Sequence, residues 1–217
     1  MKYDPTKGLD LGDGLIMAPV AFLSYPHLFK PHAFGDGKAE FSGTLLWPKG
    51  TNLYLPSKIL LDCAASKWSP DTSKWPKEFR DAAKGRPFLT SSSLWALHDG
   101  DVDKPDKEGY SGRVFCKVHR KPDFEAPLCR LRNNAPATER DLYAGCQVIA
   151  WLKAYAYEYS GKKGLSFGLE GIQKWADGPR LGAKRLSEDD FESHDDAEDA
   201  GAYDQAAGDQ MVPRYNW

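Results

Sequence analysis

Stretches with the period of a β-strand alternate along this chain with stretches that have the period of a helix. In residues 38–47, the positions of Phe41, Gly43, Leu45 and Trp47 alternate with polar neighbours. A period of two predicts a strand with one buried face. Strand-like runs of this kind cover residues 14–25, where Pro19 predicts a bend or an edge, and residues 38–47, 112–121, 128–132, 145–159 and 165–175.

The helical period governs two stretches between the second and the third strand-like run. Residues 56–68 place four apolar side chains on one helical face, and Pro56 suits a first turn. Residues 73–85 also place apolar side chains on one helical face, with Ser73 as a candidate N-terminal cap and Gly85 as a candidate helix terminator. Five to six strands with one or two short helices between them predict a mainly β fold, a small closed or half-closed barrel.

The run at residues 112–121 has two chemically different faces. Val114, Cys116 and Val118 are predicted to point one way. The opposite face would then carry a row of cations with an aromatic ring in its middle: Arg113, Phe115, Lys117, His119 and Lys121. The apolar face is typical of a strand that packs on a core. The basic face is typical either of an anion-binding surface or of an ordinary solvated sheet face.

Two further runs repeat this contrast. Arg130 and Arg132 are predicted to share a face at residues 128–132. In the long run at residues 145–159, small aliphatic residues alternate with a face that carries Trp151, Lys153 and Tyr155. The pattern alone leaves open whether this aromatic face is the core of the barrel or an exposed platform.

Cations interleaved with aromatic rings match the chemistry of a single-stranded nucleic acid. Lysine and arginine neutralise phosphates and release their counterions. Flat rings accept unstacked bases at roughly 1–3 kcal/mol per base, whatever the base. We therefore take nine residues as candidate DNA contacts: Arg113, Phe115, Lys117, His119, Arg130, Arg132, Trp151, Lys153 and Tyr155.

The sequence gives little support to metal or nucleophile chemistry. Cys116 and His119 have a metal-like spacing, but a strand would point them to opposite faces. Residues 98–112 are expected to form a charged loop. Within it, the stretch from Asp99 to Tyr110 begins like a calcium loop, yet Lys104 stands where glycine is required and Tyr110 where a bidentate glutamate is required, so a solvated turn is expected there. Hydrolase, P-loop and zincin motifs do not occur. We predict no catalytic residue, no metal and no cofactor.

The near-neutral charge of the chain is the sum of a basic part and an acidic part. The 217 residues carry a formal charge of −2, but residues 1–186 hold 28 basic and 21 acidic residues, a charge of +7. Residues 187–217 hold ten acidic residues and one basic residue, a charge of −9. A basic body predicts an anionic partner.

The chain has no apolar run of 18 residues and no apolar leader, so we expect no membrane contact, four free thiols and a cytoplasmic location.

Several blocks resemble a phage family of single-stranded DNA-binding proteins, first catalogued as a domain of unknown function and related in fold to the T7-type protein. These blocks are residues 38–52, 109–118, 142–182 and 188–191, and the likeness covers most of residues 10–191. The resemblance implies an OB-fold core, a role in replication or recombination in the cytoplasm of the host cell, and an acidic C-terminal tail. His98 stands where the family pattern leads us to expect arginine, so no contact is assigned there.

Charge and composition divide the chain after residue 186. With the fold that the resemblance implies, residues 1–186 are expected to form an OB-fold nucleic-acid-binding domain and residues 187–217 a disordered acidic tail. A tethered tail of opposite charge can occupy a DNA groove until DNA displaces it. The freed tail would then dock replication or recombination proteins through Glu188, Asp189, Asp190, Phe191, Tyr215 and Trp217. Single-stranded DNA is the expected partner, and duplex binding and a homodimer are left open.

Two rival functions belong to other classes. A metal-dependent nuclease or nucleotide-processing enzyme could use Asp99, Asp101 and Asp103, and it would cleave labelled DNA in the presence of magnesium. A protein-interaction module could use the acidic tail as a mimic of DNA, and it would bind proteins but not DNA.

Overall fold

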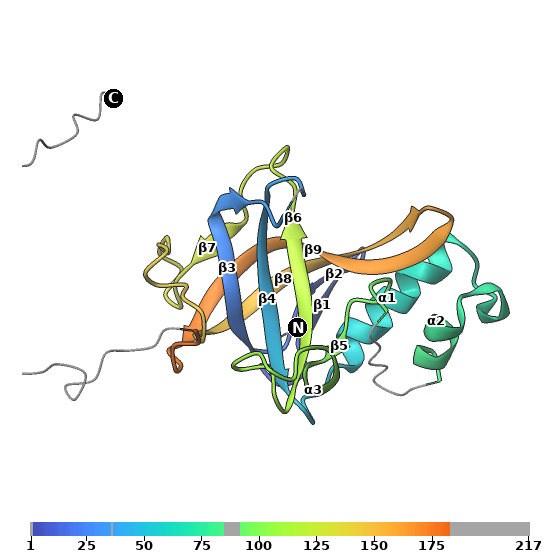
Figure 1. Cartoon of the computed structure of the whole chain (residues 1–217), viewed down its shortest axis with the longest axis horizontal. Helices are drawn as coiled ribbons and strands as arrows, with labels where there is room; N and C mark the ends of the chain where they lie inside the picture. The colour runs from blue at the N-terminus through green and yellow to red at the C-terminus, as the bar shows by residue number, and fades with distance from the viewer. Residues whose placement is uncertain (1, 36, 85–91, 183–217) are drawn as a thin grey trace, which may run out of the picture. The chain divides into compact units, whose positions relative to one another are not determined.

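The computed structural model describes residues 2–35, 37–84 and 92–182, which belong to one compact unit, Met1–Gly182 (Figure 1). The predicted acidic tail and its docking residues lie outside the described residues, as does Gly85. The described part of the chain is mainly β, as predicted. None of the helices in these ranges is long and apolar enough to cross a membrane.

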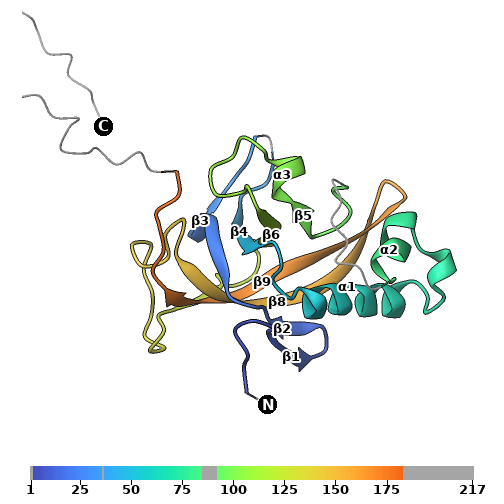
Figure 2. The ribbon, with the colours of Figure 1, turned by 90° about the horizontal axis from the view of Figure 1, so that it is seen from below.

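Five strands close into a barrel (Figure 2): β3 (Ala21–His32), β4 (Glu40–Pro48), β6 (Arg113–Arg120), β9 (Lys162–Ala176) and β8 (Gln147–Tyr159). β3 pairs with β4 and β4 with β6, both antiparallel. A parallel pairing joins β6 to β9, and antiparallel pairings join β9 to β8 and β8 back to β3. A closed five-stranded ring in this order is the OB-type barrel.

Four shorter strands extend the barrel at its margins. β1 (Leu9–Gly12) and β2 (Leu15–Met17) form a hairpin beside β8. β5 (His98–Asp99) pairs with β6, and β7 (Leu128–Arg130) runs parallel to β9. The run expected at residues 14–25 is broken between β2 and β3, because Pro19 has no amide hydrogen for the ladder.

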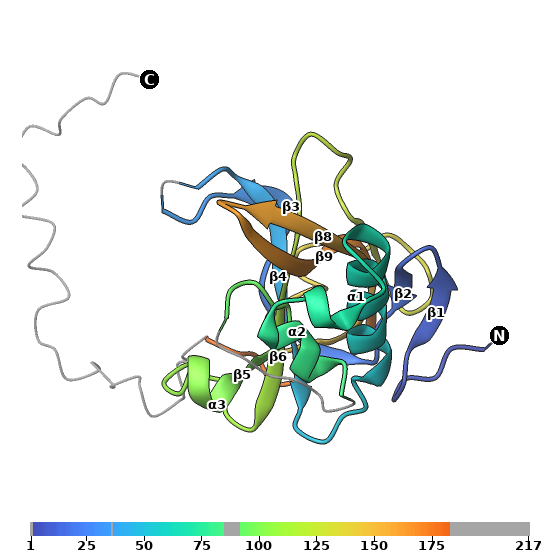
Figure 3. The ribbon, with the colours of Figure 1, turned by 90° about the vertical axis from the view of Figure 1, so that its right-hand side faces the viewer.

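Between β4 and β6 in sequence lie the helices of the described residues: α1 (Tyr54–Lys67), the 3₁₀ turn η1 (Thr72–Lys74), α2 (Lys77–Ala82) and α3 (Gly100–Asp103). α1 packs against β8 and β9, and α2 lies next to α1 (Figure 3). The cap expected at Ser73 is wrong. The Asp71 carboxylate instead accepts a hydrogen bond from the Ser73 backbone N–H, which begins η1.

The barrel interior follows the predicted alternation. Leu23, Leu45 and Cys116 are fully buried there, and each buried aliphatic side chain contributes roughly 1.5–3 kcal/mol. The long β8 supplies Val148, Ala150, Leu152 and Ala154 to this core. The aromatic face of β8 therefore lies on the outside of the barrel, which settles the question that the pattern left open.

A second, smaller cluster covers part of the outer face of β4 and β6. Leu46, Tyr110 and Phe115 are buried together there, and Phe22 and Leu181 pack against them. Tyr110 belongs to the segment that the sequence predicted as a charged loop. That segment begins with β5 and α3, and the turns that follow them place Tyr110 over the outer face of the barrel.

Candidate nucleic-acid interface

The outer face of β4 and β6 is hollowed between the β3–β4 connection and the segment that follows α3. A cavity of about 630 Å³ opens there. Its lining comes from β3, β4, β6 and the two flanking segments: Tyr25, His32, Phe34, Gly37, Lys38, Glu40, Ser42, Gly43, Thr44, Lys104, Lys107, Tyr110, Lys117, Val118 and His119.

A second cavity, of about 670 Å³, adjoins the first and extends toward β8 and β9. The two cavities share Lys104, Lys117 and His119. The extension is lined mainly by aromatic and small residues: Ser93, Trp95, Ala96, His98, Asp103, Phe115, Tyr155, Tyr157, Leu165 and Ser166. Together the two cavities form one continuous depression, which we call the β4–β6 groove.

The charge of the groove is positive. Four lysines line it, Lys38, Lys104, Lys107 and Lys117, against the two carboxylates of Glu40 and Asp103. Asp103 lies 2.9 Å from His98 Nδ1, so this carboxylate already has a partner. Lys117 is exposed and has no ion-pair partner in the described ranges. A surplus of cations over acids along a groove attracts a chain of phosphates.

Exposed aromatic rings stand at the other rim of the groove. Phe34 is 62% exposed and meets the rings of His27 and His32 edge-on. Those two imidazoles stack on each other with centroids 4.3 Å apart. Partial burial, together with the neighbouring His32, lowers the pKa of His27 below its ordinary value of 6.5.

Tyr25 lies on a bulge of β3, where the pairing with β4 shifts between Ser24 and His27. The residue has a φ of +46° and is 48% exposed. A bulky side chain at positive φ costs of order 1–3 kcal/mol, and such strain concentrates at functional sites. The bulge thus carries an exposed ring into the groove.

At the inner end of the groove, a hydrogen bond of 2.7 Å joins the Tyr155 hydroxyl and His119 Nε2. Burial raises the pKa of Tyr155 above its ordinary value. The contact crosses β9, where the outward positions hold only Ser166 and Gly168. Lys117, His119 and Tyr155, three of the predicted contacts, are therefore gathered in one groove.

The structure corrects the prediction for Phe115 as a stacking residue. Phe115 is only 2% exposed, although it points away from the barrel interior as predicted. The His98 imidazole stacks on its ring at 4.9 Å, and Tyr110 covers it edge-on at 5.2 Å. A base cannot reach the ring face without displacing these neighbours. Arg113 packs its guanidinium 4.4 Å above the Phe22 ring and does not line the groove.

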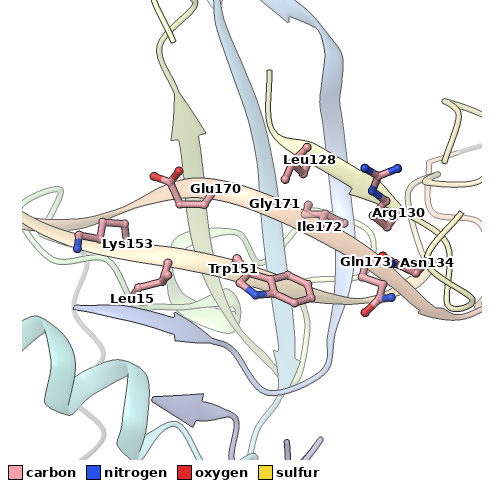
Figure 4. Close-up of a pocket in the computed structure, with 10 residues that line it drawn as sticks. All are labelled: Leu15, Leu128, Arg130, Asn134, Trp151, Lys153, Glu170, Gly171, Ile172 and Gln173. Atoms are coloured by element: carbon pink, nitrogen blue, oxygen red, sulfur yellow. The ribbon is translucent and has the colours of Figure 1, made fainter. Parts of the chain in front are cut away.

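The remaining predicted contacts lie on a different surface, shown in Figure 4. Arg130, Trp151 and Lys153 line a depression of about 740 Å³ on the outer face of β7, β8 and β9, which we call the Trp151 trough. Arg132 lines neither the trough nor the β4–β6 groove. β7 ends at Arg130, and the Arg132 guanidinium packs 4.5 Å above the Trp175 ring. The prediction that Arg130 and Arg132 share one DNA-facing strand face is wrong.

Sequence reasoning missed Tyr25, Phe34, Lys104 and Lys107. Tyr25 was taken as the end of a regular strand, and the two lysines were assigned to a solvated loop. An aromatic residue directly before Pro26, and one next to Gly35, were the available signals, because both mark irregular backbone.

The carboxylates of the rival nuclease function are engaged with the protein itself. The Lys49 ammonium lies 2.7 Å from both Asp99 and Asp101. Asp99 also accepts a hydrogen bond from the Asp101 backbone N–H at the start of α3. In the described ranges, no group of three His, Cys, Asp or Glu side chains is arranged to hold a metal ion. These acids hold the segment after β5 against the barrel.

The geometry defines a class of protein: an OB-type barrel whose second and third strands carry a cationic and aromatic groove. The chain belongs to the family described as the single-stranded DNA-binding protein of Enterobacter phage Enc34, whose model matches residues 15–201. A relative, protein p50 of Acyrthosiphon pisum secondary endosymbiont phage 1, is 30% identical over 160 residues, which are 72% of this chain and 80% of p50.

Two solved structures share the fold. The single-stranded DNA-binding protein of bacteriophage Enc34, in complex with single-stranded DNA, has a TM-score of 0.62 and 23% identity, covering 84% of this chain and 97% of that one. The bacteriophage T7 single-stranded DNA-binding protein gp2.5 has a TM-score of 0.51 and 10% identity, covering 92% and 98%.

Proposed function

We propose that this protein binds single-stranded DNA along the β4–β6 groove. The observation that carries the proposal is the groove itself, where Lys117 and His119 connect two cavities lined by four lysines and exposed rings. OB folds use the face of their second and third strands, with the adjoining loops, to hold oligonucleotides. Membership in the Enc34 family, whose namesake is a single-stranded DNA-binding protein, supports the same ligand.

The chemistry of the groove favours binding without sequence preference. Lysine contacts neutralise phosphates and make the affinity fall with salt. Tyr25 and Phe34 offer ring faces that accept any base, at roughly 1–3 kcal/mol for each stacked base. We infer that the protein coats and protects single-stranded DNA during phage replication or recombination, acting by binding rather than by catalysis.

We further propose that residues 187–217 regulate this groove. A segment of charge −9 attached to a body of charge +7 has a high effective concentration at the lysines and competes with DNA for them. DNA, a denser polyanion, displaces the segment. The freed acidic and aromatic residues, among them Phe191 and Trp217, then dock other replication or recombination proteins.

The proposal is tested with fluorescent oligo-dT and a duplex of equal length. We expect oligo-dT to bind at low salt, the affinity to fall linearly with salt on logarithmic axes, and the duplex to bind more weakly. Cleavage of labelled DNA on adding magnesium would favour the nuclease instead. Absence of DNA binding by full-length and tail-deleted protein would favour the protein-interaction module.

A further inference from the structure

The Trp151 trough lies outside the β4–β6 groove and has the same chemistry. Figure 4 shows Trp151 between Lys153 at one end and Arg130 at the other. Trp151 is half-buried, so part of its indole faces solvent. Its cross-strand partners are Gly171 on β9, over which Leu128 of β7 lies, and Met17 on β2.

The polar groups of the trough leave one cation available. Lys153 donates a hydrogen bond to the backbone oxygen of Asp13, and Glu170 is paired with Arg120. The Arg130 side chain, in contrast, has no ion pair or side-chain hydrogen bond within the described ranges. A half-buried guanidinium without a partner is suited to a phosphate, which it can bind through two hydrogen bonds.

A row of outward-facing side chains connects the trough to the groove. Trp151, Lys153 and Tyr155 occupy alternate positions of β8, and their neighbours Leu152 and Ala154 are buried in the barrel. Tyr155 already lines the groove. Tyr155 is four positions after Trp151, a distance of about 13 Å along β8. The row therefore alternates ring, cation and ring from one depression to the next.

We propose that the Trp151 trough is an auxiliary site for single-stranded DNA. It is filled when the bound DNA continues out of the β4–β6 groove and crosses β8. One unpaired base stacks on Trp151, and an adjacent phosphate binds Arg130. The inference rests on the proposed function and adds to it a second segment of the DNA path. A short oligonucleotide fills the groove alone, and only a longer one reaches the trough.

The test is a length series of oligo-dT, from about 6 to about 30 nucleotides, which brackets the roughly 4–16 nucleotides that one OB fold covers. Trp151→Ala and Arg130→Ala are compared with wild type. Both variants should bind the short oligonucleotides normally, which also reports an intact fold. They should bind the long ones more weakly, with Trp151→Ala losing roughly 5- to 150-fold, the factor that one stacked base contributes. The number of nucleotides that one protein occludes should fall in both.

Matched controls separate the site from general charge and surface effects. Lys77→Ala removes one cation from α2, and Tyr54→Ala removes a ring that is 68% exposed on α1. Neither should change binding at any length. Lys117→Ala, in the groove, should weaken binding at every length.

Three results would overturn the inference. Normal binding of all lengths by both trough variants would assign the trough to another occupant, such as an acidic peptide. An equal loss at every length would place Trp151 in the primary path rather than in an auxiliary site. Failure of wild-type and tail-deleted protein to bind any length would remove the proposed function and, with it, this site.

Discussion

The Lys107 ammonium lies 5.8 Å from the centroid of the Tyr25 ring, so a cation from the segment after α3 is paired with an exposed ring on the bulge of β3. The two elements are far apart in sequence, and both line the β4–β6 groove. A base stacked on Tyr25 would therefore have a phosphate-binding group beside it.

Tyr25 should serve binding at the expense of stability. We expect Tyr25→Ala and Tyr25→Gly to lose about five-fold or more in oligo-dT affinity, because both remove the ring. Glycine accepts the φ of +46°, so Tyr25→Gly should be more stable than Tyr25→Ala by about 1 kcal/mol. Urea denaturation and fluorescence anisotropy measure the two quantities. Full affinity in both variants would show that the ring stacks no base.

Phe115 and Phe34 should behave in opposite ways. Phe115→Ala should lower the free energy of unfolding by about 3–5 kcal/mol, because the ring is buried under His98 and Tyr110. Phe34→Ala, at a site that is 62% exposed, should change stability by less than about 0.5 kcal/mol and weaken DNA binding. Thermal unfolding with an affinity measurement decides the matter. A stable Phe115→Ala protein with weakened binding would restore Phe115 as a stacking residue.

Protonation of His27 should destabilise the protein. Burial, with His32 close by, lowers the pKa of His27 in the folded state, so the unfolded state binds more protons at pH values below 6.5. This contribution to stability is complete above pH 6.5 and is lost as the pH falls toward the lowered pKa. Replacing His27 with Gln should flatten the pH dependence of the urea midpoint in this window. An unchanged pH profile in that variant would assign the effect to other groups.

Deletion of residues 187–217 takes the formal charge from −2 to +7 and should tighten oligo-dT binding. The difference in oligo-dT affinity between truncated and full-length protein should be largest at low salt. At physiological ionic strength, screening over about 8–10 Å weakens both the competing interaction and DNA binding. A scrambled segment of the same composition should restore most of the competition. Docking of partner proteins should be lost on scrambling. Equal affinities of full-length and truncated protein at low salt would contradict competition.

Alternation along single strands could be predicted from the sequence, because the side-chain period of a strand is fixed by its backbone. It placed Cys116 inside the barrel and Lys117 outside, and it put the rings of β8 on the face opposite the aliphatic residues. The closed barrel came from counting strands, and the structure confirms it.

Alternation says nothing about which outer faces meet. Lys117 and Arg130 were grouped because both face outward. The structure instead places them in different depressions. β6 pairs with β9 at Gly168, and β7 pairs with the same edge of β9 further along, from Gly171 to Gln173. The burial of Phe115 depends on His98 and Tyr110, which belong to the segment directly before β6 and fold back over the strand. Such tertiary cover carries no local sequence signal.

The groove is tested most directly by the salt dependence of oligo-dT binding in two lysine variants. Lys117→Ala removes an exposed cation from the groove, and Lys77→Ala removes one from α2 at equal cost in net charge. We expect Lys117→Ala to weaken binding and to make the slope of log affinity against log salt shallower by about 0.7–1, the share of one phosphate contact. Lys77→Ala should leave the slope of wild type. Identical slopes in all three proteins would contradict the proposal that DNA lies along β4 and β6.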